Sequence, residues 1–133
     1  MTTTLGLLVR TLACFALVFA TWNPSGYHSL AWLHGDARLA ARALVAAGLL
    51  TLHILFVRIT WLSLGPAGIA LALMILVSGI FALSELGAVD LASVITRDYL
   101  ALMSIALLLA TGLNWSLVKR RVTGQSNYLS PPP

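Results

Sequence analysis

The chain has 133 residues, of which 59% are hydrophobic and only 9% charged, and its formal net charge is +4. A soluble domain has about 25% charged residues, and one small core could not bury this much apolar surface. The composition therefore predicts a single integral membrane domain. It excludes a nucleic-acid-binding surface, because the 8 basic residues are spread among apolar segments. The single cysteine, Cys14, excludes an internal disulfide.

The first apolar segment covers residues 5–22 and contains Arg10. A membrane-spanning helix needs about 20 residues to cross about 30 Å of hydrocarbon, so the segment is long enough. Residues 18–20 (Val-Phe-Ala) would suit a signal-peptide cleavage site. Against that interpretation, Arg10 interrupts the apolar run in the wrong place, and we expect a retained span.

The loop that follows, residues 21–36, is rich in aromatic and turn-forming residues. Its motif comprises Trp22, Asn23, Pro24, Gly26, Tyr27 and Trp32. The residue before a proline favours extended backbone, and Pro-Ser-Gly favours a tight turn. Tryptophan and tyrosine prefer the headgroup level of a bilayer. We therefore expect this loop, with a short interfacial segment at residues 29–33, at the membrane surface.

The same loop allows a second interpretation, as half of a metal site. The possible ligands are His28, His34 and Asp36, together with Glu85 or Asp90 of a later loop. Metal sites use such side chains, but this spacing fits no known motif. We therefore expect no metal and no cofactor here, and an aromatic belt around a turn instead.

Three further apolar segments follow, at residues 37–57, 66–84 and 99–118. Pro66 suits a first helical turn, and Asp98 can cap the last segment. Each segment is expected to be helical, because backbone in lipid must satisfy its own polar groups. The predicted fold is an all-α, integral membrane four-helix bundle over residues 1–121. Residues 122–133 are polar and proline-rich, which predicts a disordered tail.

Four spans would place both termini on one side of the membrane. With the termini inside, the inner basic residues are Arg10, Arg58, Lys119, Arg120 and Arg121, and the outer ones are Arg38, Arg42 and Arg97. The positive-inside rule then favours an N-in, C-in orientation. The basic cluster at residues 119–121 is expected to contact anionic lipid headgroups of the cytoplasmic leaflet.

Arg10, His53 and Asn114 are predicted at a similar depth, on the cytoplasmic side. Polar residues in lipid are costly, and they face other helices or extend to the interface. In one interpretation Arg10 reaches a lipid phosphate, while the other two side chains hydrogen-bond neighbouring helices. In the alternative, all three line the path of a small oligomeric channel or carrier.

Small residues form rows that let helices approach each other closely. They are Ala43, Ala47 and Gly48 in the second segment, Gly68, Ala72, Ser78 and Gly79 in the third, and Ala110 and Gly112 in the fourth. Such rows can hold one chain together or mediate oligomers. No Ser/His/Asp set, P-loop, GxGxxG or HExxH motif is present. We predict no catalytic residues and no enzyme, but an accessory or assembly subunit of a larger membrane complex, or a homo-oligomer.

Three stretches together suggest a relationship to a known family. They are TWNPSGY at residues 21–27, SLGPAG at 63–68, and NWS at 114–116 followed by KRR at 119–121 and GQ at 124–125. They resemble a family of small four-span bacterial inner-membrane proteins whose function is unassigned. The resemblance implies a multi-pass protein of the bacterial inner membrane and supplies no activity.

Overall fold

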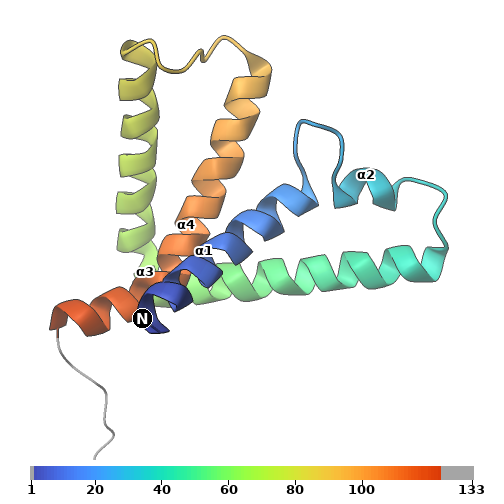
Figure 1. Ribbon diagram of the computed structural model, residues 1–133, viewed down its shortest axis with the longest axis horizontal. Helices are drawn as coiled ribbons and strands as arrows, with labels where there is room; N and C mark the ends of the chain where they lie inside the picture. The colour runs from blue at the N-terminus through green and yellow to red at the C-terminus, as the bar shows by residue number, and fades with distance from the viewer. Residues whose placement is uncertain (1, 124–133) are drawn as a thin grey trace, which may run out of the picture.

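The structure is a computed structural model that describes residues 2–123. Within this range the chain forms four α-helices and no strand (Figure 1). The helices are α1 (Thr2–Thr21), α2 (Ser29–Leu33), α3 (Leu39–Glu85) and α4 (Val94–Thr123). Of these, α1, α3 and α4 are long and apolar enough to cross a membrane. The prediction of an all-helical fold is therefore confirmed.

Helix α3 bends sharply at Gly65, which has φ 66° and ψ 174°. This backbone conformation is essentially restricted to glycine. Pro66 follows directly, and its missing N–H is tolerated because the next helical segment starts there. The bend divides α3 into residues 39–64 and residues 66–85, which point in different directions (Figure 1).

The helix ends differ from those expected from the sequence. Residues 58–64, expected to be a connection, continue α3 up to the bend, since none of them is glycine or proline. Helix α4 begins at Val94, five residues before the expected start, so Asp98 lies inside it and does not cap it. Ser93 takes that place, because its Oγ accepts a hydrogen bond from the Thr96 N–H at 3.4 Å.

The expected tail lies almost entirely outside the described residues. Only Val122 and Thr123 of that segment are described, and they complete the last turn of α4. The basic residues at positions 119–121, expected to follow the last span, are helical as well.

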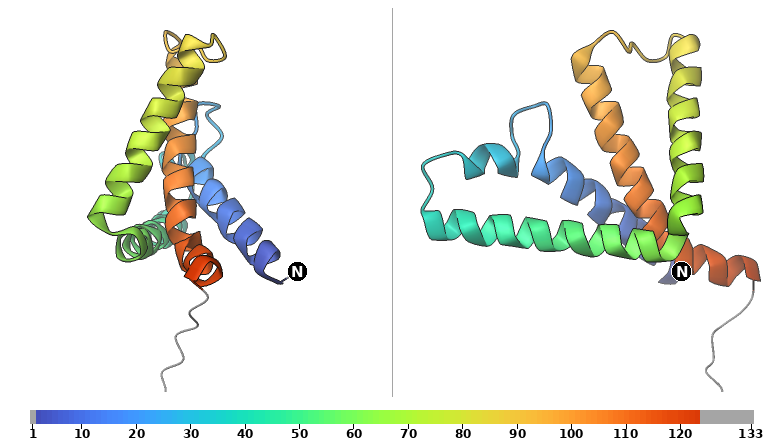
Figure 2. Two further views of the ribbon diagram at one scale, coloured as in Figure 1. Left: turned by 90° about the vertical axis from the view of Figure 1, so that its left-hand side faces the viewer. Right: turned by 180° about the vertical axis from the view of Figure 1, so that it is seen from behind.

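The long helical segments form two hairpins that share one end (Figures 1 and 2). Helix α1 and residues 39–64 form the first, joined by the loop that contains α2. Residues 66–85 and α4 form the second, joined by residues 86–93. The start of α1, the bend at Gly65 and the last turns of α4 lie at the shared end. The hairpins point away from this end, so the helices do not close into the expected bundle.

The core lies mainly between α1 and α4. Its buried side chains are Cys14, Leu17 and Val18 from α1 and Leu102, Ala106, Leu109 and Ala110 from α4. Phe15, Phe19, Phe56 and Leu113 pack around it. Helix α3 contributes one buried residue among those described, Thr60. Helix α4 is therefore the element that holds the other two long helices together.

Candidate functional site

Two polar side chains join α1 to α4 near the shared end. The Arg10 guanidinium donates from Nη1 to the Leu113 carbonyl at 3.0 Å. One residue further on each helix, Asn114 Nδ2 donates to Thr11 Oγ1, also at 3.0 Å. The Thr11 hydroxyl in turn donates to the Leu7 carbonyl at 2.9 Å. We call Arg10, Thr11, Leu113 and Asn114 the α1–α4 polar contact.

The polar contact borders an open groove of about 400 Å³. The groove is lined by Thr11, Leu107, Ala110, Thr111, Asn114, Trp115 and Val118. Asn114 has a buried Oδ1 without a hydrogen-bond partner. An amide offers two donors and an acceptor, so one acceptor of this contact stays unsatisfied. The arrangement binds helix to helix and contains no nucleophile paired with a base.

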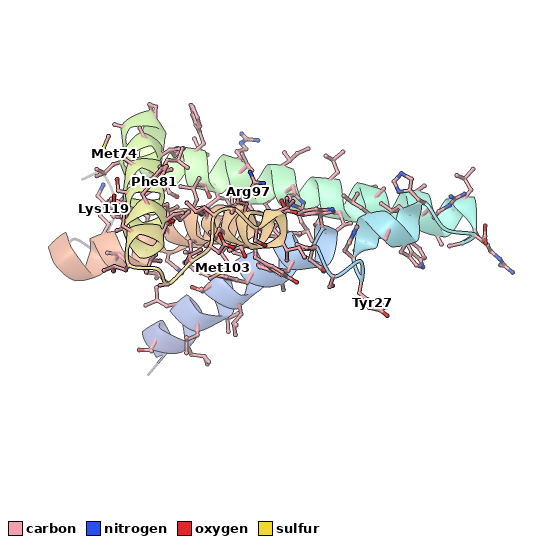
Figure 3. The ribbon with its side chains drawn as sticks, turned by 90° about the horizontal axis from the view of Figure 1, so that it is seen from above. Tyr27, Met74, Phe81, Arg97, Met103 and Lys119 are labelled. Atoms are coloured by element: carbon pink, nitrogen blue, oxygen red, sulfur yellow. The ribbon has the colours of Figure 1, made fainter. Side chains whose placement is uncertain are left out.

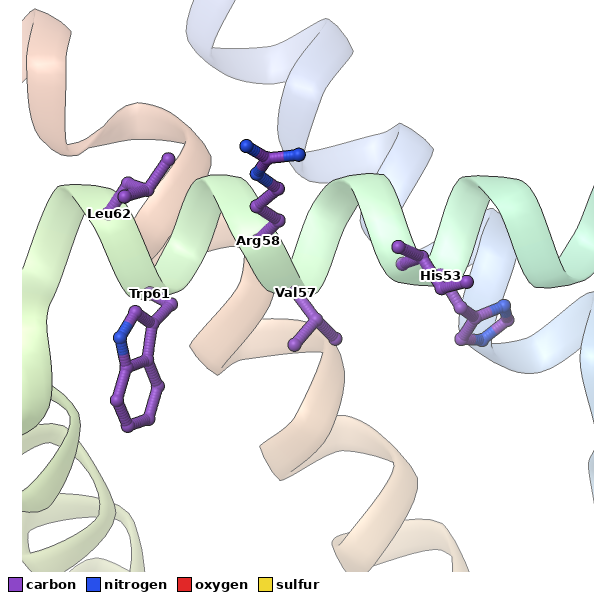
Figure 4. A pocket seen from close by; sticks show the side chains of 6 residues that line it. His53, Val57, Arg58, Trp61 and Leu62 are labelled. Carbon is purple, nitrogen blue, oxygen red and sulfur yellow. The ribbon is translucent and has the colours of Figure 1, made fainter.

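His53, the third residue of the expected polar layer, lies elsewhere. It is half-buried on α3, and its Nδ1 lies 2.8 Å from the Leu49 carbonyl of its own helix. It borders a groove of about 560 Å³ formed by α3 alone (Figure 4). The structure thus brings Arg10 and Asn114 together and leaves His53 apart. This geometry does not favour the channel alternative, which needs all three side chains on one path.

Helices α3 and α4 cross in close contact at Thr60 and Gly112. A Cβ atom added to Gly112 would lie 2.5 Å from Thr60 Oγ1 and 2.6 Å from Thr60 Cα. Thr60 is only 3% exposed, and its Oγ1 has no hydrogen-bond partner. Only glycine fits at position 112 at this separation. The row of small residues in the sequence predicted Gly112 as a helix contact, whereas nothing in the sequence predicted that Thr60 would be its partner.

The turn after α1 is built around the Asn23 side chain. Its Nδ2 donates to the Phe19 and Tyr27 carbonyls, both at 2.9 Å. Its Oδ1 accepts hydrogen bonds from the N–H and the hydroxyl of Ser25. Gly26 completes the turn after Pro24 with φ 84°. One amide therefore fastens the NPSGY stretch to the last turn of α1.

The aromatic residues of this loop lie at its surface. Tyr27 is 91% exposed and projects away from the helices, and Trp32 is 43% exposed (Figure 3). The Trp22 ring lies 6.3 Å from the His28 ring, and His28 Nδ1 accepts the Ala31 N–H that begins α2. The expected short segment at residues 29–33 is thus a capped helix.

Arg42 fixes this loop to α3. Its Nη1 donates to the carbonyls of Leu33 and Gly35, at 3.2 Å and 3.1 Å, where α2 ends. Basic side chains commonly satisfy the last carbonyls of a helix in this way. The sequence analysis treated Arg42 only as a basic residue of the outer side. Its contact with Leu33, nine residues earlier, matches no regular helix or turn spacing and could not be predicted.

The possible metal ligands are not assembled. Among residues 2–123 there is no group of three or more His, Cys, Asp or Glu side chains that could hold a metal ion. The loops at residues 22–38 and 86–93 lie at the far ends of different hairpins (Figure 1). His34 Nδ1 lies 2.7 Å from the Leu30 carbonyl, so this ring contacts its own loop.

The basic cluster begins near the shared end of the hairpins. Lys119 is exposed on α4 and is labelled in Figure 3. The side chains of Arg120 and Arg121 lie outside what the structure describes.

These features define an all-helical protein with three helices that are long and apolar enough to cross a membrane. The chain belongs to a family of unknown function (DUF6524), which matches residues 5–131. No curated protein and no solved structure matches the chain.

Proposed function

We propose that this protein is a four-span integral membrane protein of the bacterial inner membrane. In this proposal it has no catalytic activity and acts as an assembly partner, either of a larger membrane complex or of further copies of itself. The uncovered surface of α3 is the observation that carries the proposal.

Helix α3 contains 47 residues, of which only Thr60 is buried among those described. Lipid covers apolar side chains as well as a protein does, so apolar exposure alone requires no partner. The informative residues are Gly48 and Gly79, because a Cβ atom at either would meet nothing within 4 Å. Where helices touch within the chain, the contacts use small residues such as Ala106 and Gly112. The same residue type on the outer surface of α3 suits a helix from another chain.

The length of α3 supports four spans. At about 1.5 Å per residue, residues 39–64 extend for about 39 Å and residues 66–85 for about 30 Å. Each part alone can therefore cross about 30 Å of hydrocarbon. The bend at Gly65 lies near the start of α1 and the end of α4, as it would if all three faced the same side (Figure 2).

The charge distribution supports cytoplasmic termini. Five basic residues lie on the side of the shared end of the hairpins, and three lie on the side of the two connecting loops, which we call the loop side. The side with more lysine and arginine is the cytoplasmic one. The loop side contains Asp36 and Asp90, in the connections at the far ends of the two hairpins.

Native mass spectrometry in mild detergent tests assembly. The wild-type chain is expected as an oligomer or with a copurifying membrane protein. Gly48→Leu and Gly79→Leu, which one chain can accommodate, should lower that fraction. Gly6→Leu is the matched control, because Gly6 also has open space but lies outside the rows on α3. A strictly monomeric wild-type protein without a partner would contradict the proposal.

Topology is tested separately by tagging each terminus for compartment-specific labelling. Both tags should be reached only from the cytoplasm, and a cysteine introduced at Tyr27 only from outside. Termini found on opposite sides would exclude four spans.

A further inference from the structure

A groove follows the outer surface of α3 over residues 53–62, and it has a volume of about 560 Å³. Figure 4 shows His53, Val57 and Trp61 on one side of the groove and Arg58 and Leu62 on the other. Ile54, which also lines the groove, lies four residues before Arg58 and so belongs to the second ridge. Residues four positions apart form such ridges on a helix, and the groove between them is where another molecule packs.

The groove combines an apolar floor with one cation. Arg58 is exposed and forms no hydrogen bond or ion pair within the described residues. Trp61, three residues further on, is 56% exposed and offers an indole N–H. No acidic residue lines the groove. The Arg58 guanidinium is therefore available to pair with an anion from outside the chain.

We propose that this groove binds an anionic phospholipid. Its phosphate accepts hydrogen bonds from the Arg58 guanidinium, and one acyl chain lies along Val57 and Ile54 towards His53, with Trp61 on the opposite wall (Figure 4). The site rests on the proposed function in one respect, namely that residues 39–64 cross the bilayer.

The depth of the residues fits a lipid. Residues 39–64 extend for about 39 Å against about 30 Å of hydrocarbon, so Arg58, about 10 Å before the Gly65 bend, lies close enough to the headgroups for its side chain to reach them. Trp61 lies closer to the bend, at the level where tryptophan prefers the interface. His53 lies deeper, and its Nδ1 is already engaged by the Leu49 carbonyl.

A helix of another chain fits this groove less well than a lipid. The lining contains no glycine, alanine or serine that would let a second backbone approach. A packed helix would also remove the Arg58 guanidinium from solvent, and an unpaired buried charge is strongly destabilising. A phospholipid supplies both the anion and the flexible apolar chain.

Native mass spectrometry of the full chain with added phosphatidylglycerol or phosphatidylcholine tests the site. Wild type should retain phosphatidylglycerol preferentially. Arg58→Gln should lower the retained fraction about tenfold, the effect of losing one charge-assisted hydrogen bond. Arg58→Lys should keep most of it, because a lysine still binds phosphate as a point charge. Arg97→Gln is the matched control. Arg97 is also exposed, but it lies near the start of α4, away from the groove, so its replacement should not change the retained lipid.

The number of lipids bound per chain is measured separately for each oligomeric species. The lipid site can therefore be tested even if the protein proves to be a monomer. Equal retention of both lipids, or no change in Arg58→Gln, would overturn the site. So would a loss of oligomer in Arg58→Gln and Trp61→Leu without a loss of lipid, because the groove would then be a protein contact. Inorganic phosphate should not displace the lipid, since it lacks the acyl chain.

Discussion

The interface between α1 and α4 differs from the outer surface of α3, although both are apolar. The interface buries small side chains such as Cys14 and Ala106, both fully, and it contains interhelical hydrogen bonds. The outer surface of α3 carries large exposed side chains, including Leu44 at 76% and Leu62 at 74%. In lipid, an apolar surface makes a helix stable, whereas small residues and hydrogen bonds decide which helices touch.

Two arginines show the same contrast. Arg10 donates to the Leu113 carbonyl and so belongs to a helix contact. Arg58 lies on a helix of similar apolarity and has no such partner among the described residues. The first guanidinium stabilises the fold, and the second is available to an anion from the membrane.

The largest expected effect comes from Gly112→Ala at the crossing of α3 and α4. The new methyl group would overlap the Thr60 backbone, which cannot rotate away as the end of a flexible side chain can. Overpacking costs about 1–3 kcal/mol, and a contact with backbone belongs at the upper end, so we expect about 3 kcal/mol. Unfolding in mixed micelles, followed by circular dichroism, measures it.

Gly6→Ala is the control for that variant, because Gly6 lies on α1, outside the proposed contact with another chain. Nothing lies within 4 Å of the added methyl group, and alanine favours a helix over glycine by about 1 kcal/mol. The control should therefore be unchanged or slightly stabilised. Equal loss of stability in both variants would mean that α3 and α4 do not cross at Thr60.

The second effect is expected from Gly65→Ala at the bend of α3. Alanine would have to adopt φ 66° and ψ 174°, a region that costs a residue with a side chain about 1–3 kcal/mol. We expect a loss of about 2 kcal/mol, measured in the same unfolding experiment. No loss would show that the bend does not require glycine.

The sequence predicted the apolar helices and much of the loop after α1. Pro66 marked the start of a helical segment, and the NPSGY stretch marked a turn that the structure contains, with Gly26 at positive φ. These features are local, because proline and glycine restrict the backbone wherever the rest of the chain lies. The order of elements could therefore be read from residue type alone.

The sequence could not predict which helix surfaces meet. Counting residues from the ends gave Arg10, His53 and Asn114 a similar depth, but depth does not determine the direction of a side chain around its helix. In a soluble helix an apolar stripe marks that direction. In α3 the buried and the exposed sides are both apolar, so no stripe separates Thr60, which is buried, from Trp61, which is 56% exposed.

Asn23→Ala is expected to have a smaller and local effect. It removes the bonds from the Asn23 amide to the Phe19 and Tyr27 carbonyls, each worth about 0.5–1.5 kcal/mol or less where water competes. We expect about 1 kcal/mol and faster hydrogen exchange in residues 23–28. Tyr27→Ala, at a position that is 91% exposed, should change neither quantity. Slow exchange in Asn23→Ala would assign the stability of the turn to Pro24 instead.

The smallest expected effect concerns the α1–α4 polar contact. Asn114→Leu removes the 3.0 Å bond to Thr11 Oγ1 and also the unsatisfied Oδ1, so the two consequences partly cancel. Interhelical hydrogen bonds in membranes contribute about 0.6 kcal/mol on average, and a double-mutant cycle with Thr11→Val should give that coupling. A second double-mutant cycle, of His53→Leu with Thr11→Val, should give no coupling energy, because His53 contacts the Leu49 carbonyl of its own helix. A coupling of His53 to Thr11 as large as that of Asn114 would restore the three-residue layer that this structure separates.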